Sequence, residues 1–96
     1  MKKIRILIAD DHKMVREGLI ECLKHLNKYE IFEATSGAEA IEKVMKLTPD
    51  VILMDIGMPN INGFEATKAI IKHDPAAKIL VLIAHYEKEY IVCCTN

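Results

Sequence analysis

The chain has 96 residues, of which 51% are hydrophobic and 28% charged, and its formal net charge is −1 at pH 7. A chain of this length can bury one modest hydrophobic core, so we expect a single domain over residues 1–96. Because the charge is nearly balanced and every apolar run is shorter than a membrane span, we expect no direct nucleic-acid binding by this chain, no transmembrane helix and no secretory signal.

The first third of the chain predicts a strand, a helix and a second strand. Residues 4–9 form a mostly apolar run, which is typical of a parallel strand buried on both faces, and residues 29–34 predict a second, short strand. Between them a helix is predicted from about His12, and Asn27 can end it. Its apolar residues recur at helical spacing: Met14, Val15, Gly18, Leu19, Cys22, Leu23 and Leu26. We expect Cys22 to be a small buried residue of this helix without a redox role.

The middle of the chain predicts a second helix and a third strand. Ser36 and Glu39 have the spacing of a capping box, which marks the start of a helix, and Pro49 ends that helix. Residues 51–54 are a short aliphatic run and predict a strand. Residues 55–62 are rich in turn formers and predict a loop that can place backbone groups near a ligand.

The last third predicts a third helix, a fourth strand and the start of a fourth helix. Apolar residues at helical spacing run from Phe64, and Asp74 with Pro75 ends that helix. Residues 79–84 form a fourth aliphatic strand, and a short helix is expected from near Glu87. Strands that alternate with helices in this way predict an α/β fold with a parallel sheet.

Three aspartates stand where predicted strands end. Asp10 and Asp11 follow the first strand directly, and Asp55 follows the third. The carboxyl ends of parallel strands meet at one edge of the sheet, where ligands bind in open α/β sheets. Clustered carboxylates repel one another unless a cation neutralises them, and an all-oxygen site suits Mg²⁺ or Mn²⁺. The sequence therefore predicts a divalent-metal site, although any one of these residues alone would be read as a helix N-cap.

Two motifs carry a resemblance to a known family. Residues 4–12 read IRILIADDH, and residues 54–63 read MDIGMPNING, followed by EAT at 65–67. Together they resemble the response-regulator receiver domain of two-component systems, and VREGL at 15–19 with GFEAT at 63–67 resembles its NarL/LuxR-type subgroup. The resemblance implies a flavodoxin-like (CheY-like) three-layer α/β sandwich with the strand order 2-1-3-4-5. It extends from Lys3 to about Val92.

The resemblance also implies a role for each aspartate. Asp55 would accept a phosphoryl group from the phosphohistidine of a sensor histidine kinase. Asp11 would bind Mg²⁺ directly, Asp10 directly or through water, and the backbone carbonyl of Gly57 would complete the protein ligands. Such a module is cytoplasmic and signals by being modified, so it is not an ordinary turnover enzyme. The three cysteines, an odd number without metal-site spacing, fit the same reducing compartment. His12 resembles an ordinary helix-start residue of the subgroup.

Two departures from the family leave a second function open. Ile83 stands where the family has a Thr or Ser that bonds the phosphoryl group, and Asn96 is reached before the family's fifth strand, its lysine and the DNA-binding output domain. The alternative function is a degenerate receiver that does not take phosphate and acts by pairing with another protein. A metal-dependent phosphatase would need a second acid two residues after Asp55, where Gly57 stands.

The same departures suggest how copies of the chain could associate. Without its last β-α unit, we expect the strand over residues 79–84 to present an open apolar edge. Open edges pair with other chains, so the sequence predicts a homodimer, or a swapped assembly, through this edge and residues 86–94. Tyr90, Ile91 and Cys94 could instead complete a fourth helix against the sheet.

Overall fold

The computed structural model describes residues 3–55, 63–84 and 89–94. Its elements are β1 (Ile4–Ala9), α1 (Lys13–Lys24), β2 (Tyr29–Ala34), α2 (Gly37–Leu47), β3 (Val51–Asp55), α3 (Gly63–His73), β4 (Ile79–Ala84) and β5 (Glu89–Cys94). None of the described helices is long and apolar enough to cross a membrane.

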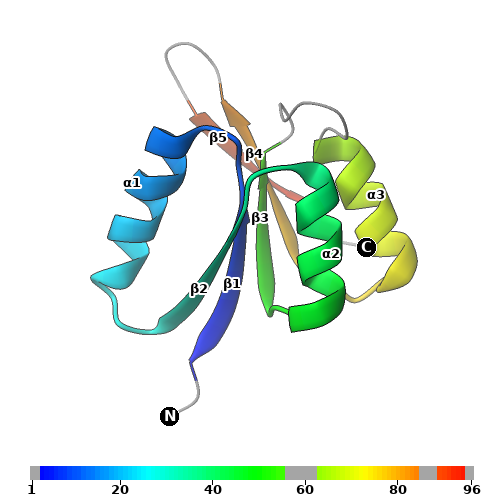
Figure 1. Ribbon diagram of the computed structural model, residues 1–96, viewed down its shortest axis with the longest axis horizontal. Helices are drawn as coiled ribbons and strands as arrows, with labels where there is room; N and C mark the ends of the chain where they lie inside the picture. Colours follow the sequence, from blue (N-terminus) through cyan, green and yellow to red (C-terminus); the bar gives the residue numbers. More distant parts are fainter. Residues whose placement is uncertain (1–2, 56–62, 85–88, 95–96) are drawn as a thin grey trace.

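The strands form one five-stranded sheet in the order β2-β1-β3-β4-β5. The first four strands are parallel, with Ala9 paired to Ala34 on one side and to Met54 on the other. Helix α1 covers one face of the sheet, and α2 and α3 cover the opposite face (Figure 1). The predicted three-layer α/β sandwich and the order of its first four strands are therefore confirmed.

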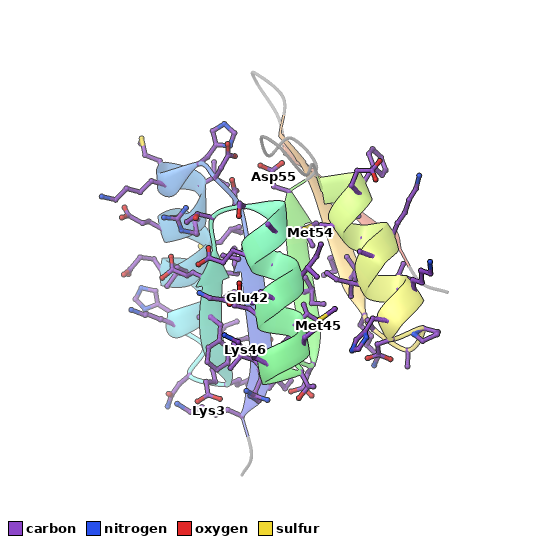
Figure 2. All side chains as sticks on the ribbon, turned by 45° about the vertical axis from the view of Figure 1, so that its right-hand side comes forward. Lys3, Glu42, Met45, Lys46, Met54 and Asp55 are labelled. Atoms are coloured by element: carbon purple, nitrogen blue, oxygen red, sulfur yellow. The ribbon has the colours of Figure 1, made fainter. Side chains whose placement is uncertain are left out.

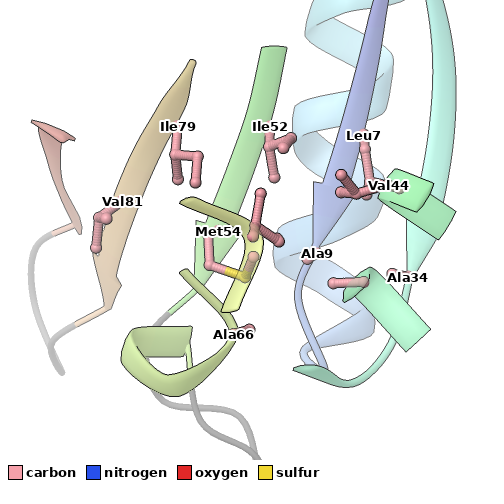
Figure 3. Close-up of a cluster of buried hydrophobic side chains, with 11 residues drawn as sticks. Leu7, Ala9, Ala34, Val44, Ile52, Met54, Ala66, Ile79 and Val81 are labelled. Carbon is pink, nitrogen blue, oxygen red and sulfur yellow. The ribbon is translucent and has the colours of Figure 1, made fainter. Parts of the chain in front are cut away.

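The hydrophobic core lies between the sheet and the α2–α3 layer (Figure 3). Alanines at the closest approaches of helix and strand, such as Ala34, Ala40 and Ala66, are fully buried and let the layers pack closely. The rest of this core is aliphatic: Leu7, Ala9, Val44, Ile52, Met54, Ile70, Ile79 and Val81. On the other face, Ile6 and Ile8 of β1 are buried, but α1 itself has no buried residue.

The exposure of α1 corrects one prediction. Cys22 is exposed, and not buried as its place in the helical pattern suggested. Helical spacing shows which side chains share a face, but burial of that face needs an element packed over it. Met14 on the same helix is 87% exposed.

The end of the chain corrects another. Glu89–Cys94 is not part of a fourth helix but a strand, β5, which runs antiparallel to β4 from the pair Ala84–Glu89 to the pair Ile79–Cys94. An aromatic and β-branched run favours a strand, and pairing satisfies the backbone groups that β4 would otherwise leave open. The open β4 edge was thus a wrong prediction, because the chain fills this edge itself. Residues 85–88 lie outside the described part.

Candidate metal centre

The strand register places the first and third aspartates side by side. Ala9 and Met54 are partners in adjacent parallel strands, so Asp10 and Asp55, which come next, lie at the same edge. The backbone N–H of Asp10 donates to the carbonyl of Ala34 at 3.0 Å, which extends the pairing of β1 with β2 beyond the last strand residue. Figure 2 shows Asp55 at the carboxyl end of the sheet, beyond the core residue Met54.

Four side chains meet at this edge. Asp10, Asp11, His12 and Asp55 each offer a ligand atom, and these atoms all lie within 4.8 Å of one another. The carboxylates of Asp10 and Asp55 are buried, whereas the side chain of Asp11 is 28% exposed. The structure therefore brings together the three aspartates that the sequence singled out. Gly57, the fourth predicted ligand, lies outside the described residues.

His12 is the member of the cluster that sequence reasoning missed. Its Nδ1 lies 3.1 Å from Asp11 Oδ1, 3.3 Å from Asp10 Oδ1 and 3.5 Å from Asp55 Oδ2. His12 is the N-cap of α1 and has an extended backbone, with φ −91° and ψ 105°. The available signal was its position directly after the acid pair, but a residue at a helix start is more often a cap than a ligand.

Hydrogen bonds hold the acidic segment in place. The backbone N–H of His12 donates to Asp10 Oδ1 at 2.8 Å, which fixes the orientation of that carboxylate. Arg16 Nη1 donates to the backbone carbonyl of Asp10 at 2.8 Å, and Arg16 Nε donates to Glu33 Oε1 at 2.7 Å. A largely buried arginine thus ties the start of α1 and the end of β2 to the residue that begins the site.

The electrostatics of the cluster call for a cation. Burial, and then the charge of Asp55, raises the pKa of Asp10 to about 6, although the N–H of His12 works in the opposite direction. The Asp11 carboxylate, the largest influence on His12, raises the pKa of that imidazole. Ionised carboxylates are costly here because water cannot solvate them fully. A donor set of three carboxylates at one sheet edge fits Mg²⁺ or Mn²⁺.

The sequence of the whole domain agrees with this site. A model of the response regulator receiver domain family matches residues 6–96. The chain belongs to this family. Among its relatives, the transcriptional regulatory protein DegU of Brevibacillus brevis is 44% identical over 90 residues, which cover 93% of this chain and 38% of DegU. The receiver chain thus spans about two fifths of the length of that relative.

Solved receiver domains have the same fold. The response regulator protein TrrA from Thermotoga maritima, in complex with Mg²⁺ and BeF, gives a TM-score of 0.81 at 39% identity, over 88% of this chain and 72% of that chain. A LuxR-family two-component response regulator from Aurantimonas sp. SI85-9A1 gives a TM-score of 0.81 at 36% identity, over 88% of this chain and 61% of that chain. These matches confirm both the receiver fold and the NarL/LuxR-type resemblance.

Proposed function

We propose that this receiver domain accepts a phosphoryl group on Asp55 from the phosphohistidine of a sensor histidine kinase, with Mg²⁺ bound beside it. The observation that carries the proposal is the buried carboxylate of Asp55 at the end of β3, next to Asp10 and close to Asp11. The module would act in the cytoplasm, without touching nucleic acid itself, as part of a transcriptional regulator of the DegU kind.

The mechanism needs few moving parts. Asp10, Asp11, Asp55 and the Gly57 carbonyl would hold the ion, which when bound neutralises charge on the phosphoryl oxygens. An ionised oxygen of Asp55 attacks phosphorus in line, the P–O bond forms as the P–N bond of the phosphohistidine breaks, and the kinase imidazole leaves with that electron pair. The protein mainly positions the acceptor, because Arg16 and the N–H of His12 fix the neighbouring segment.

A second candidate function is a degenerate receiver that acts by pairing with another protein. Ile83 in β4 favours it, because an aliphatic side chain cannot bond the phosphoryl group as the family's Thr or Ser does. Removing one such donor typically costs on the order of 100-fold in rate. Under this reading the acid cluster binds a cation, but Asp55 stays unmodified.

Intact-mass spectrometry after incubation with acetyl phosphate and Mg²⁺ separates the two functions. We expect one added phosphoryl group on the wild-type chain and none on Asp55→Asn. Asp50→Asn is a matched control, because Asp50 stands at the opposite end of the same strand, where it accepts from the Arg5 backbone N–H. This control should be modified like the wild type. A wild-type chain that binds Mg²⁺ but gains no phosphoryl group would favour the degenerate receiver.

A further inference from the structure

We infer that His12 is a protein ligand of this site through Nδ1, and that it makes the site accept Zn²⁺ as an alternative to Mg²⁺. The inference deepens the proposed metal site and rests on it. It concerns which class of cation the site accepts: the oxygen-preferring ions alone, or also a borderline ion that prefers a nitrogen donor.

The spacing of the donors carries the inference. In a tetrahedral zinc site with metal–ligand bonds of about 2.0 to 2.2 Å, neighbouring donor atoms lie about 3.3 to 3.6 Å apart. His12 Nδ1 lies 3.1, 3.3 and 3.5 Å from one oxygen each of Asp11, Asp10 and Asp55. One nitrogen and three carboxylates therefore already have close to the mutual spacing of a four-coordinate ion. Octahedral Mg²⁺ places its ligands closer together, about 3 Å apart, and does not favour imidazole.

The competing explanation is that His12 is only a counter-ion. Its side chain is 57% exposed, and a protonated imidazole beside three carboxylates would be attracted to them without any metal. The two explanations predict opposite effects when the imidazole is removed. A lost counter-ion leaves the cluster more negative, so every cation should bind as tightly as before or more tightly. A lost ligand weakens the cation that uses nitrogen and spares the one that does not.

Zinc in this position would also affect signalling. A four-coordinate ion that uses Asp10, Asp11, His12 and Asp55 engages an oxygen of the proposed phosphoryl acceptor. It also excludes Mg²⁺ from the same carboxylates. Zn²⁺ would therefore act as a competitive inhibitor of phosphorylation, and the cation that fills the site would decide whether Asp55 is available.

The test is isothermal titration calorimetry of the wild-type chain and of His12→Ala with Zn²⁺ and with Mg²⁺, in separate titrations. We expect His12→Ala to weaken Zn²⁺ binding by about tenfold or more, since even outer-shell partners of metal ligands are typically worth 10- to 100-fold. Mg²⁺ affinity should be unchanged or higher. His25→Ala, which removes an exposed histidine at the far end of α1, should change neither titration.

Other outcomes separate this inference from the proposed function. If Mg²⁺ binds and His12→Ala leaves Zn²⁺ affinity unchanged or raises it, His12 is a counter-ion and the inference is overturned while the proposed function stands. If the wild-type chain binds neither ion, both fail. His12→Gln provides a second variant with a polar side chain, and it should lose Zn²⁺ affinity like His12→Ala. Circular dichroism of each variant checks that the fold is intact.

Discussion

Asp10 is a residue whose charge works against folding. It is 1% exposed, and burial raises its pKa from 3.8 to about 6. The folded state therefore binds more protons than the unfolded state between these two values, and the free energy of unfolding falls as the pH rises through this window. At neutral pH the ionised carboxylate would cost up to ~3 kcal/mol, since one pKa unit corresponds to about 1.4 kcal/mol.

Asp10→Asn should therefore stabilise the metal-free chain at pH 7. The amide removes the buried charge, and its oxygen can still accept the hydrogen bond from the His12 backbone N–H. We expect urea denaturation to show a free energy of unfolding higher by up to ~3 kcal/mol at pH 7, and a gain that vanishes below about pH 4.

Glu17→Gln is the control for this substitution, because it removes an acid from the exposed side of α1 and should leave the unfolding free energy nearly unchanged. Addition of Mg²⁺ should stabilise the wild type and reduce the advantage of Asp10→Asn. An Asp10→Asn chain that is less stable at pH 7 would contradict the assigned cost of burying this carboxylate.

At the scale of residues, the sequence predicted where charges gather better than which side chains take part. Each of Asp10, Asp11 and Asp55 follows a strand, and parallel pairing alone brings strand ends together. The place of His12 in the cluster depends on a backbone conformation and a rotamer that spacing does not encode. The exposure of Cys22 depends on what packs over α1, which a helical pattern also leaves open.

At the scale of elements, strong local signals predicted structure well and a short apolar run did not. The capping box at the start of α2 forms: Ser36 Oγ accepts from the Glu39 backbone N–H at 3.1 Å, and Glu39 accepts from the Thr35 backbone N–H. Asn27 takes the left-handed conformation after α1, with φ 51°. The six residues of β5 are too few for their periodicity to distinguish a helix from a strand.

β5 determines whether β4 presents an open edge. Removing residues 89–96 should expose the backbone groups of β4 along the pairs from Ile79 to Ala84. We expect the shortened chain to self-associate at micromolar concentration, with a mass above that of a monomer by light scattering, because exposed apolar edges pair with other strands. The full chain should keep the monomer mass.

A charged edge residue provides the control. Leu80→Lys in the shortened chain places a lysine on β4, a device that blunts sheet edges, and should restore the monomer mass. A full-length chain that is dimeric under the same conditions would mean that β5 exchanges between copies. That result would support the swapped assembly predicted from the sequence, in place of the edge covered within one chain.

At the scale of the whole molecule, the two faces of the sheet are packed unequally. Helices α2 and α3 bury Ala40, Val44, Ala66 and Ile70 against the strands, whereas α1 buries no residue. Elements with few buried contacts open at lower free energy than the global unfolding transition. We therefore expect α1 to be the helix that opens most readily among those described.

Amide hydrogen exchange tests this expectation. In the metal-free chain, amides of α1 should exchange faster than those of α2 and α3, because less apolar surface is exposed when α1 opens. Mg²⁺ should slow exchange in α1 more than in α3, since Asp11 lies directly before α1 and α3 lies outside the donor cluster. Equal protection of all three helices without metal would contradict the inequality of the two faces.

The loosely packed helix has a consequence for ligand affinity. Asp11 and His12 precede α1 directly, and Arg16 within it holds the Asp10 carbonyl, so each opening of the helix takes the site apart. Only the closed population is competent to bind, and the apparent dissociation constant is the intrinsic one divided by the closed fraction. A protein partner that braces α1 would thus tighten cation binding without touching the ion, and the cation would in turn favour that partner by the same factor.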